Sequence, residues 1–218
     1  MQALVDSVNS YWMTEYKVDG FRFDFTKGFG NRFKSQSSDE WGSKYDAGRI
    51  ELLKRMADKI WEVKSDAIVS FEHLAENSEE KELANHGIML WGNMNHDYRN
   101  LGKGLSRSVE WAYHKKRGWD QPNVIAYMES HDEERVMWDV SKNTEKSKAL
   151  IKLQLNAAFF FTIPGPKMIW QFGEMGYDEE LNNDRLAIKP THWEYLEDEE
   201  RSDLTIVDVH FFFFFFFL

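Results

Sequence analysis

The sequence predicts an α/β fold, an incomplete (β/α)8 TIM barrel made of about strands 4 to 8 with their helices. Short apolar runs alternate with helical patterns, which is typical of a parallel sheet covered on both faces. Polar residues repeatedly follow the predicted strands, at the end where such barrels keep their active sites. Asp132 lies 60 positions and two strand–helix units after Glu72, and this repeat of about 30 residues fits roughly 250 residues for eight units.

The first predicted strand runs from Phe21 to Phe25 and follows an amphipathic helix at residues 2–16. Phenylalanines alternate with Arg22 and Asp24 at the two-residue period of a strand, so one face carries a guanidinium beside a carboxylate. A neighbouring cation keeps a carboxylate ionised, and a fixed, ionised carboxylate at a strand end is what a nucleophile requires. The alternative interpretation is a surface ion pair on a half-exposed strand.

The remaining elements are predicted from periodicity and composition. A loop rich in glycine, serine and asparagine occupies residues 28–45, and Asp46 caps a helix with an apolar stripe over residues 47–63. Further strands are predicted at residues 67–71, 88–91, 124–128 and 167–170, and further helices at about residues 105–116 and 145–161. This makes five strands, whereas a barrel needs eight, so three strands are expected upstream of Met1.

Three acidic residues, Asp24, Glu72 and Asp132, lie at or just past the C-terminal ends of predicted strands. Because TIM barrels gather such residues at one rim, we expect the three carboxylates to converge. Converging carboxylates suit cleavage of a glycosidic bond, in which one attacks the anomeric carbon and another protonates the leaving oxygen. The sequence has no glycine-rich phosphate loop, HExxH pair or Gly-x-Ser-x-Gly elbow that would favour another chemistry.

A divalent-metal hydrolase that uses the same acids is the competing hypothesis. Its nitrogen ligands would come from His73, His96 or His131. The spacing of these histidines gives them no shared helical face, which makes this hypothesis the weaker one, and we predict no metal site in the chain.

Composition excludes some partners and favours others. A formal net charge of -10 argues against binding a nucleic acid. Aromatic residues make up 16% of the chain, and flat aromatic faces suit sugars, with Trp91 and Trp170 as the stacking candidates at strand ends. Residues 1–6 lack the basic start and apolar run of a signal peptide, and the absence of cysteine leaves the compartment undetermined.

The C-terminal sequence is unusual because Phe211 to Phe217 is a run of phenylalanines. Only about 15 residues there are mainly apolar, whereas a bilayer span needs roughly 20, so no membrane partner is predicted. We interpret residues 201–218 as an aberrant or artefactual tail, and residues 1–200 as the C-terminal portion of a catalytic barrel.

Three segments resemble the conserved motifs of the alpha-amylase family, the retaining glycoside hydrolases that act on alpha-glucans. GFRFDFTK at residues 20–27 resembles the nucleophile motif, SFEHLAEN at 70–77 the acid/base segment, and MESHDEER at 128–135 the last conserved segment. The similarity extends from about Tyr11 to Glu200 and includes residues 164–174 and 189–195. All three motifs occur in the family's order and at strand ends, which makes the resemblance specific.

The resemblance implies a role for each residue that matches a motif. Asp24 would be the nucleophile, Arg22 the cation that orients it, and Glu72 the general acid and then base. Glu72 needs a raised pKa in the free enzyme for that task. Asp132 would bind sugar hydroxyls and stabilise the distorted ring, with a hydrogen bond from His131 beside it.

Two further positions match less specifically. Lys27 would contact the sugar on the leaving-group side, unless it is a solvated charge. Arg135 would contact substrate, unless it is a structural ion-pair partner of Glu133 or Glu134. The other acids after the second strand, Glu76, Glu79 and Glu80, are predicted to form a solvated face.

The resemblance implies an enzyme that cleaves alpha-1,4-glucans such as starch, glycogen and maltooligosaccharides through a covalent glycosyl-enzyme intermediate. It implies no required cofactor, with calcium expected only in the part upstream of Met1, which would also carry the family's first motif. We therefore expect this chain to be a fragment that is inactive alone. The alternatives are a transglycosylase or branching enzyme with the same site, and a non-catalytic glucan-binding fragment. Glu133 stands where many members have Asn, which leaves the subgroup open.

Overall fold

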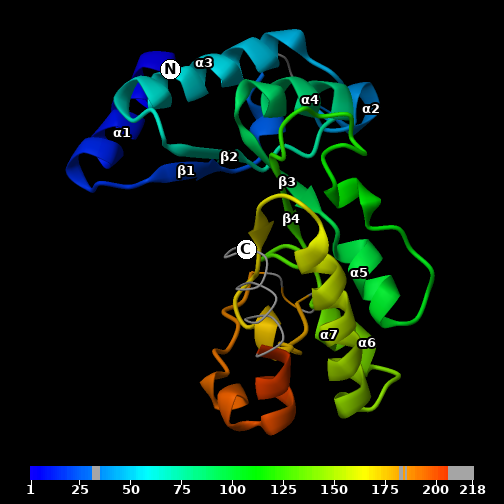
Figure 1. The fold of residues 1–218 in the computed structure, drawn as a ribbon. Coiled ribbons are helices and arrows are strands. Elements are labelled where there is room, and N and C mark those ends of the chain that lie inside the picture. Colours follow the sequence, from blue (N-terminus) through cyan, green and yellow to red (C-terminus); the bar gives the residue numbers. More distant parts are fainter. Residues whose placement is uncertain (31–34, 182–183, 185, 206–218) are drawn as a thin grey trace. The chain divides into compact units, whose positions relative to one another are not determined.

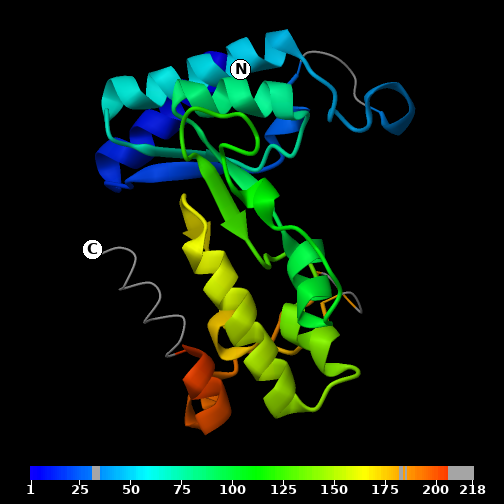
Figure 2. The same cartoon turned by 45° about the vertical axis from the view of Figure 1, so that its right-hand side comes forward.

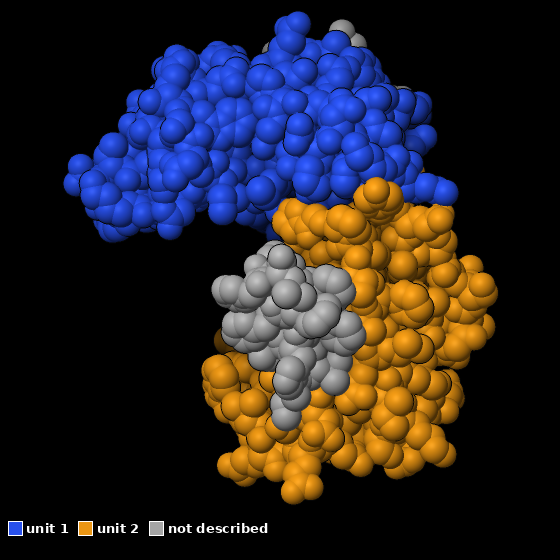
Figure 3. Space-filling view, in the orientation of Figure 1, with its two compact units in different colours: residues 1–92, 114–125 blue, residues 93–113, 126–218 orange. Residues whose placement is uncertain are grey.

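The computed structural model describes all residues except 31–34, 182–183, 185 and 206–218. The described chain divides into two compact units, which Figure 3 shows in different colours. Unit 1 comprises residues 1–92 and 114–125, and unit 2 comprises residues 93–113 and 126–218.

Five strands form one sheet in the order β1-β2-β3-β4-β5 (Figure 1). They are β1 (Gly20–Phe23), β2 (Ile68–Phe71), β3 (Met89–Asn93), β4 (Val124–Tyr127) and β5 (Lys167–Met168). Sequential neighbours pair in parallel, and parallel neighbours require a crossover connection between them. This order is that of part of a (β/α)8 barrel and confirms the predicted fold class.

Unit 1 places its helices beside β1 and β2. They are α1 (Gln2–Glu15), α2 (Gln36–Asp39), α3 (Ala47–Val63) and α4 (Asn77–His86). Asp46 caps α3 as predicted, because its side chain accepts hydrogen bonds from the backbone N of Gly48 (3.1 Å) and Arg49 (3.3 Å). The apolar stripe of α3 is buried, and α3 and α4 run along the same side of β1 and β2 (Figures 1 and 2).

Three α-helices of unit 2 lie side by side (Figures 1 and 2). They are α5 (Asn95–Gly102), α6 (Val136–Ser141) and α7 (Lys146–Thr162). The Asn156 amide donates to the Tyr98 carbonyl oxygen (3.0 Å), and the Tyr98 ring packs edge-on against Phe160, so polar and aromatic contacts join α7 to α5. Short 3-10 helices follow at η2 (Glu110–Ala112), η3 (Gly173–Met175) and η4 (Trp193–Glu197).

Two local predictions are wrong. The helix expected at residues 105–116 is mostly irregular, and the helix in this part of the chain is α5, which begins after Asn93 Oδ1 accepts a hydrogen bond from the Asn95 N (2.9 Å). Gly104 follows α5 in the left-handed region (φ +84°), and Leu105 is exposed, so the apolar spacing after it does not face a core. The first strand ends at Phe23, because Phe25 turns into the left-handed region (φ +43°).

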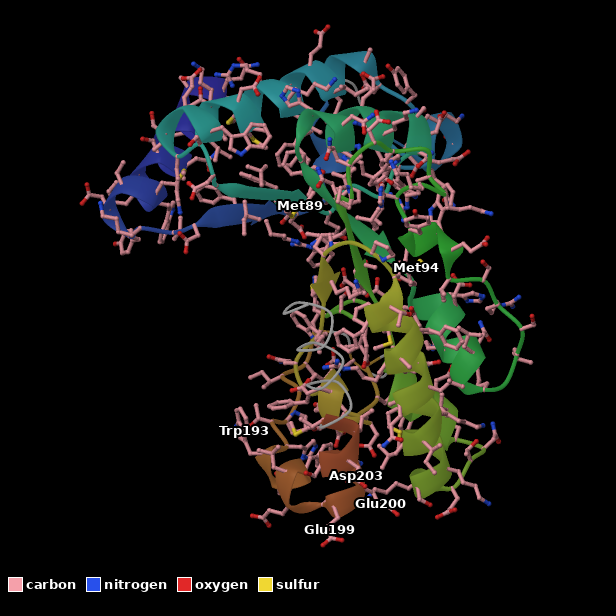
Figure 4. The ribbon with its side chains drawn as sticks, viewed as in Figure 1. Met89, Met94, Trp193, Glu199, Glu200 and Asp203 are labelled. Carbon is pink, nitrogen blue, oxygen red and sulfur yellow. The ribbon has the colours of Figure 1, made fainter. Side chains whose placement is uncertain are left out.

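The final described residues, 199–205, are helical. Arg201 is buried and donates to the Met175 carbonyl oxygen (2.9 Å) and to the Asp178 carboxylate (2.7 Å), whereas the acids labelled in Figure 4 on this segment, Glu199, Glu200 and Asp203, are exposed. The phenylalanine run that we interpret as an artefact lies outside the described residues. None of the described helices combines the length and apolarity needed to cross a membrane.

Candidate active site

Strands β1 and β2 deliver the first two predicted carboxylates side by side. Phe23 pairs with Phe71 in the parallel register, so the next residue on each strand is Asp24 or Glu72. The pairing continues beyond the strands, because the Glu72 N donates to the Phe23 carbonyl oxygen (3.0 Å). Both carboxylates therefore leave the sheet at its carboxyl edge, as the fold class predicts.

The Arg22 guanidinium binds both carboxylates. Its Nη1 lies 2.7 Å from Asp24 Oδ1, and its Nη2 donates to Glu72 Oε2. The Asp24 side chain is 70% exposed and the Glu72 side chain only 14%, so one carboxylate is open and the other enclosed. Arg22 also lies over the ring of buried Trp91 (4.2 Å), which covers the indole that we predicted to stack on a sugar.

The surroundings of Glu72 favour its protonated form. Burial raises the pKa of the Glu72 carboxyl, a hydrogen bond with the Asp24 carboxylate raises it further, and Arg22 opposes both effects. Two adjacent carboxyls, one enclosed with a raised pKa and one open, match a general acid beside a nucleophile.

Lys27 is held by protein oxygens. It follows β1 in the 3-10 turn η1 (Thr26–Gly28), and its Nζ donates to Ser43 Oγ (3.2 Å) and to the Leu74 carbonyl oxygen (3.3 Å). Burial lowers the pKa of the Lys27 ammonium, while the nearby Glu72 raises it. The ammonium is therefore not a freely solvated charge, and its contact with sugar stays a prediction.

A pocket of about 650 Å³ lies beside Lys27 in unit 1. Ser43 and Leu74, which accept the two hydrogen bonds of Lys27, both line it. The other lining residues are Glu40, Lys44, Tyr45, Ala75 and Glu76. The pocket thus combines polar side chains with one aromatic ring, a composition that suits a hydroxyl-rich ligand.

Asp132 and His131 lie together in unit 2, on the segment that follows β4. His131 Nε2 is 3.5 Å from Asp132 Oδ2, and both side chains are 43% exposed. The Asp132 N donates to Ser130 Oγ (3.1 Å), and the His131 ring lies 5.6 Å from the half-buried ring of Trp170. The predicted meeting of Asp132 with Asp24 and Glu72 involves both units and stays a prediction.

Arg135 is buried inside unit 2. Its Nη1 lies 3.5 Å from Glu129 Oε2, its Nη2 donates to the Gln171 carbonyl oxygen (3.1 Å), and its guanidinium lies over the Tyr177 ring. This placement favours the structural ion-pair alternative, with Glu129 as the partner in place of Glu133 or Glu134. Substrate contact by Arg135 stays a prediction.

The prediction of a solvated acidic face after β2 is wrong for two of its three members. Glu79 and Glu80 are 0% and 4% exposed, whereas Glu76 is exposed. Arg49 Nε and Nη2 bind the two oxygens of Glu79 (2.6 and 2.7 Å), and Arg117 Nη1 binds Glu80 (3.0 Å). A buried carboxylate needs such a partner, and each partner lies far away in the sequence.

Sequence reasoning also missed two buried residues behind the carboxylates, Thr26 and His73. Thr26 Oγ1 lies 2.9 Å from His73 Nδ1, and His73 Nε2 lies 2.9 Å from Glu79 Oε1. The one signal that pointed to this cluster was Arg49, a charged residue next to the apolar stripe of α3. Within the described ranges, no group of three or more His, Asp and Glu side chains is arranged to hold a metal ion.

Comparison with known proteins gives one family match. The model of the alpha amylase catalytic domain matches residues 1–205. The 1,4-alpha-glucan branching enzyme GlgB of Salinibacter ruber (strain DSM 13855 / M31) is 26% identical over 208 residues, which cover 84% of this chain and 32% of that protein. This chain therefore spans about a third of the length of its curated relative.

Solved structures of low sequence identity share the fold. An Anoxybacillus alpha-amylase matches with a TM-score of 0.68 and 17% identity, covering 96% of this chain and 43% of that one. Pullulanase type I from Bacillus subtilis str. 168, a complex with maltose, matches with a TM-score of 0.68 and 18% identity, covering 96% of this chain and 32% of that one.

Proposed function

Because the chain belongs to the alpha-amylase catalytic-domain family, we propose that the whole protein acts on alpha-1,4-glucans through a covalent glycosyl-enzyme intermediate. The observation that carries this proposal is that one guanidinium, Arg22, binds the carboxylates of both Asp24 and Glu72 at the ends of adjacent parallel strands. The proposed reaction needs no cofactor.

In the first step, Asp24 attacks the anomeric carbon while Glu72 protonates the leaving glycosidic oxygen. The exposure of Asp24 supports the first role, because a nucleophile must reach the sugar. The raised pKa of Glu72 supports the second, because a general acid must hold its proton near neutral pH. In the second step, Glu72 takes a proton from water or a sugar hydroxyl, which displaces Asp24.

A retaining outcome follows from how close these carboxylates lie. Retaining enzymes keep their two carboxyl groups about 5–5.5 Å apart, whereas inverting enzymes leave room for a water between them. Ion pairs from Asp24 and Glu72 to the two ends of one planar guanidinium support the short separation.

Four further residues complete the proposed site. Lys27, at the edge of the 650 Å³ pocket, would contact the sugar on the leaving-group side. Asp132 and His131 would bind hydroxyls of the distorted ring, and their mutual proximity supports a joint role. Arg135 would act by holding the segment that carries them, since its own guanidinium is buried.

The test uses two variants of the full-length enzyme. Asp24→Asn should lower the release of reducing sugar from starch by at least about 10³-fold, as loss of a nucleophile does in other covalent enzymes. Glu72→Gln should still react with alpha-glucosyl fluoride, whose leaving group needs no proton, and the ester should appear on the peptide that contains Asp24. Starch cleavage by Asp24→Asn at the wild-type rate would refute the assignment.

A branching or transglycosylating enzyme is the second candidate, favoured by the similarity to a branching enzyme over 84% of this chain. In that case a glucan hydroxyl takes the place of water in the second step. Incubation with amylose separates the two candidates: new alpha-1,6 linkages in the proton NMR spectrum indicate branching, and reducing ends without them indicate hydrolysis.

We also propose that these 218 residues alone bind glucan at most and do not cleave it. The chain spans about a third of its branching-enzyme relative, and apolar side chains on α1 (Leu4, Val8) and on α7 (Ile151, Leu155) are exposed. A soluble preparation of the 218 residues that cleaves starch would contradict this.

A further inference from the structure

We propose that Thr26, His73, Glu79 and Arg49 form a positioning network that fixes the two turns carrying Asp24 and Glu72. This inference rests on the proposed function, because it assigns these residues a role in that reaction. All four side chains lie in unit 1 and are at most 1% exposed, so the network acts through the backbone and not by touching substrate.

Both carboxylate turns contain a residue in a sterically unfavourable conformation. Phe25, next to Asp24, has φ +43°, and Leu74, two residues after Glu72, has φ +51°. Neither is a glycine, so each backbone conformation costs free energy and persists only where surrounding contacts enforce it. Because a strained residue lies beside each proposed catalytic residue, surrounding contacts must hold the two turns in place.

Four polar contacts tie one turn directly to the other. The Thr26 N donates to the Glu72 carbonyl oxygen (2.9 Å), and Thr26 Oγ1 lies 2.9 Å from His73 Nδ1 and 3.2 Å from the Glu72 carbonyl oxygen. Lys27 Nζ donates to the Leu74 carbonyl oxygen (3.3 Å). Each contact joins Thr26 or Lys27 in the first turn to a residue of the second turn, residues 72–74. The two turns therefore cannot shift independently of each other.

Glu79 and Arg49 anchor this linkage from behind. His73 Nε2 bonds to Glu79 Oε1 (2.9 Å), and Arg49 holds both oxygens of Glu79. The same guanidinium donates to the carbonyl oxygens of Lys27 and Gly42. Arg49 thereby connects the turn after Asp24 with the loop that lines the pocket beside Lys27.

The protonation states of Glu79 and His73 determine which atom donates each hydrogen bond of the network. Although burial pushes the pKa of Glu79 up, hydrogen bonds from His73 and Arg49 bring it below its ordinary value, so Glu79 is ionised and only accepts. Burial lowers the pKa of His73, so its ring is neutral and donates from Nε2 to Glu79. His73 Nδ1 must then accept, and Thr26 Oγ1 donates to it. The Thr26 hydroxyl is committed to the network and is not available to a substrate.

Thr26→Val tests the network with little risk to folding, because valine keeps the shape of threonine and the Thr26 N–H bond to Glu72. In the full-length enzyme we expect kcat to fall about tenfold with KM within twofold, since small misplacements of catalytic groups are costly. The alkaline limb of the kcat/KM profile should move to lower pH, because a looser Asp24 raises the pKa of Glu72 less. Thr26→Ser should restore both quantities, and the control Thr14→Val, an exposed hydroxyl in α1, should change neither.

Arg49→Lys is the second variant. Lysine keeps the positive charge but lacks the planar guanidinium whose nitrogens bind Glu79, Lys27 and Gly42. It should lower kcat in the same way. Wild-type kcat and pH profile in both Thr26→Val and Arg49→Lys would overturn the positioning role, even if the melting temperature falls. An inactive wild-type enzyme would overturn the proposed function instead, so the two failures are distinguishable.

Discussion

Unit 1 contains two pairs of acidic residues, one at the ends of β1 and β2 and one on α4, and the protein surrounds them in opposite ways. Asp24 and Glu72 share one partly exposed guanidinium, and Asp24 stays open. Glu79 and Glu80, on α4, are each buried against a guanidinium of their own, Arg49 or Arg117. The first arrangement leaves carboxylates able to react, whereas the second uses them to fix the backbone.

This comparison shows that a cluster of acids near a strand end does not by itself identify a catalytic site. The distinguishing features are the exposure of one carboxylate and the sharing of a single cation. Glu79 and Glu80 each bind one guanidinium and accept further hydrogen bonds, so these buried carboxylates have little capacity left to bind a ligand. The same rule explains Arg135 and Glu129 in unit 2, which are both buried and paired.

The largest effect should come from a matched pair of Arg→Met variants. Arg49→Met leaves Glu79 buried without its main partner and should lower the free energy of unfolding by about 3–5 kcal/mol. Arg22→Met removes a partly exposed cation and should cost within about 1 kcal/mol, yet lower kcat about 10²-fold by misplacing both carboxylates. Urea unfolding and starch hydrolysis measure the two effects. Equal losses of unfolding free energy in the two variants would contradict the difference between Arg49 and Arg22.

A smaller effect concerns the pH dependence of stability. Burial raises the pKa of Glu80 to about 7, with Arg117 opposing. The native state therefore holds a proton that the unfolded state loses near pH 4.5, so Glu80 makes the protein less stable as pH rises from about 4.5 to 7. The change is on the order of 3 kcal/mol.

Glu80→Gln should flatten that part of the stability curve, because glutamine stays neutral throughout. The matched control is Glu76→Gln, at the exposed member of the same acidic run, which should leave the curve unchanged. Urea unfolding at pH 5, 6 and 7 checks both variants. A Glu80→Gln curve as steep as that of the wild type would mean that another group titrates there.

The sequence predicted the elements whose signals are local. Alternating and apolar runs located all five strands, and the Asp46 cap located α3. Asp24 and Glu72 were predictable for the same reason, since each follows a strand directly. Helix α4 was not predicted, because its buried face carries Glu79 and Glu80 and so lacks an apolar stripe.

The positioning network behind the site could not be predicted from the sequence, for a different reason. Arg49 and Glu79 are 30 positions apart, and Thr26 and His73 are 47 apart, so no spacing rule links them. The helix predicted at residues 105–116 failed because apolar periodicity does not say whether a core lies beside it. Arg135 pairs with Glu129, six residues away, and no sequence pattern favours that partner over the adjacent glutamates.

The smallest effect is expected for a substitution of Lys27. This residue has protein partners, like the buried acids, yet those partners, Ser43 and Leu74, line the pocket. If it binds sugar on the leaving-group side, Lys27→Met should raise KM for maltooligosaccharides about ten- to a hundredfold, because a hydrogen bond to a charged group contributes about 1.5–3 kcal/mol. The KM for alpha-glucosyl fluoride should not change, because that substrate has no sugar on the leaving side. An equal rise in KM for both substrates would show that Lys27 does not bind the leaving-group sugar. Its ammonium would then only hold Ser43 and Leu74 against the turn after Asp24.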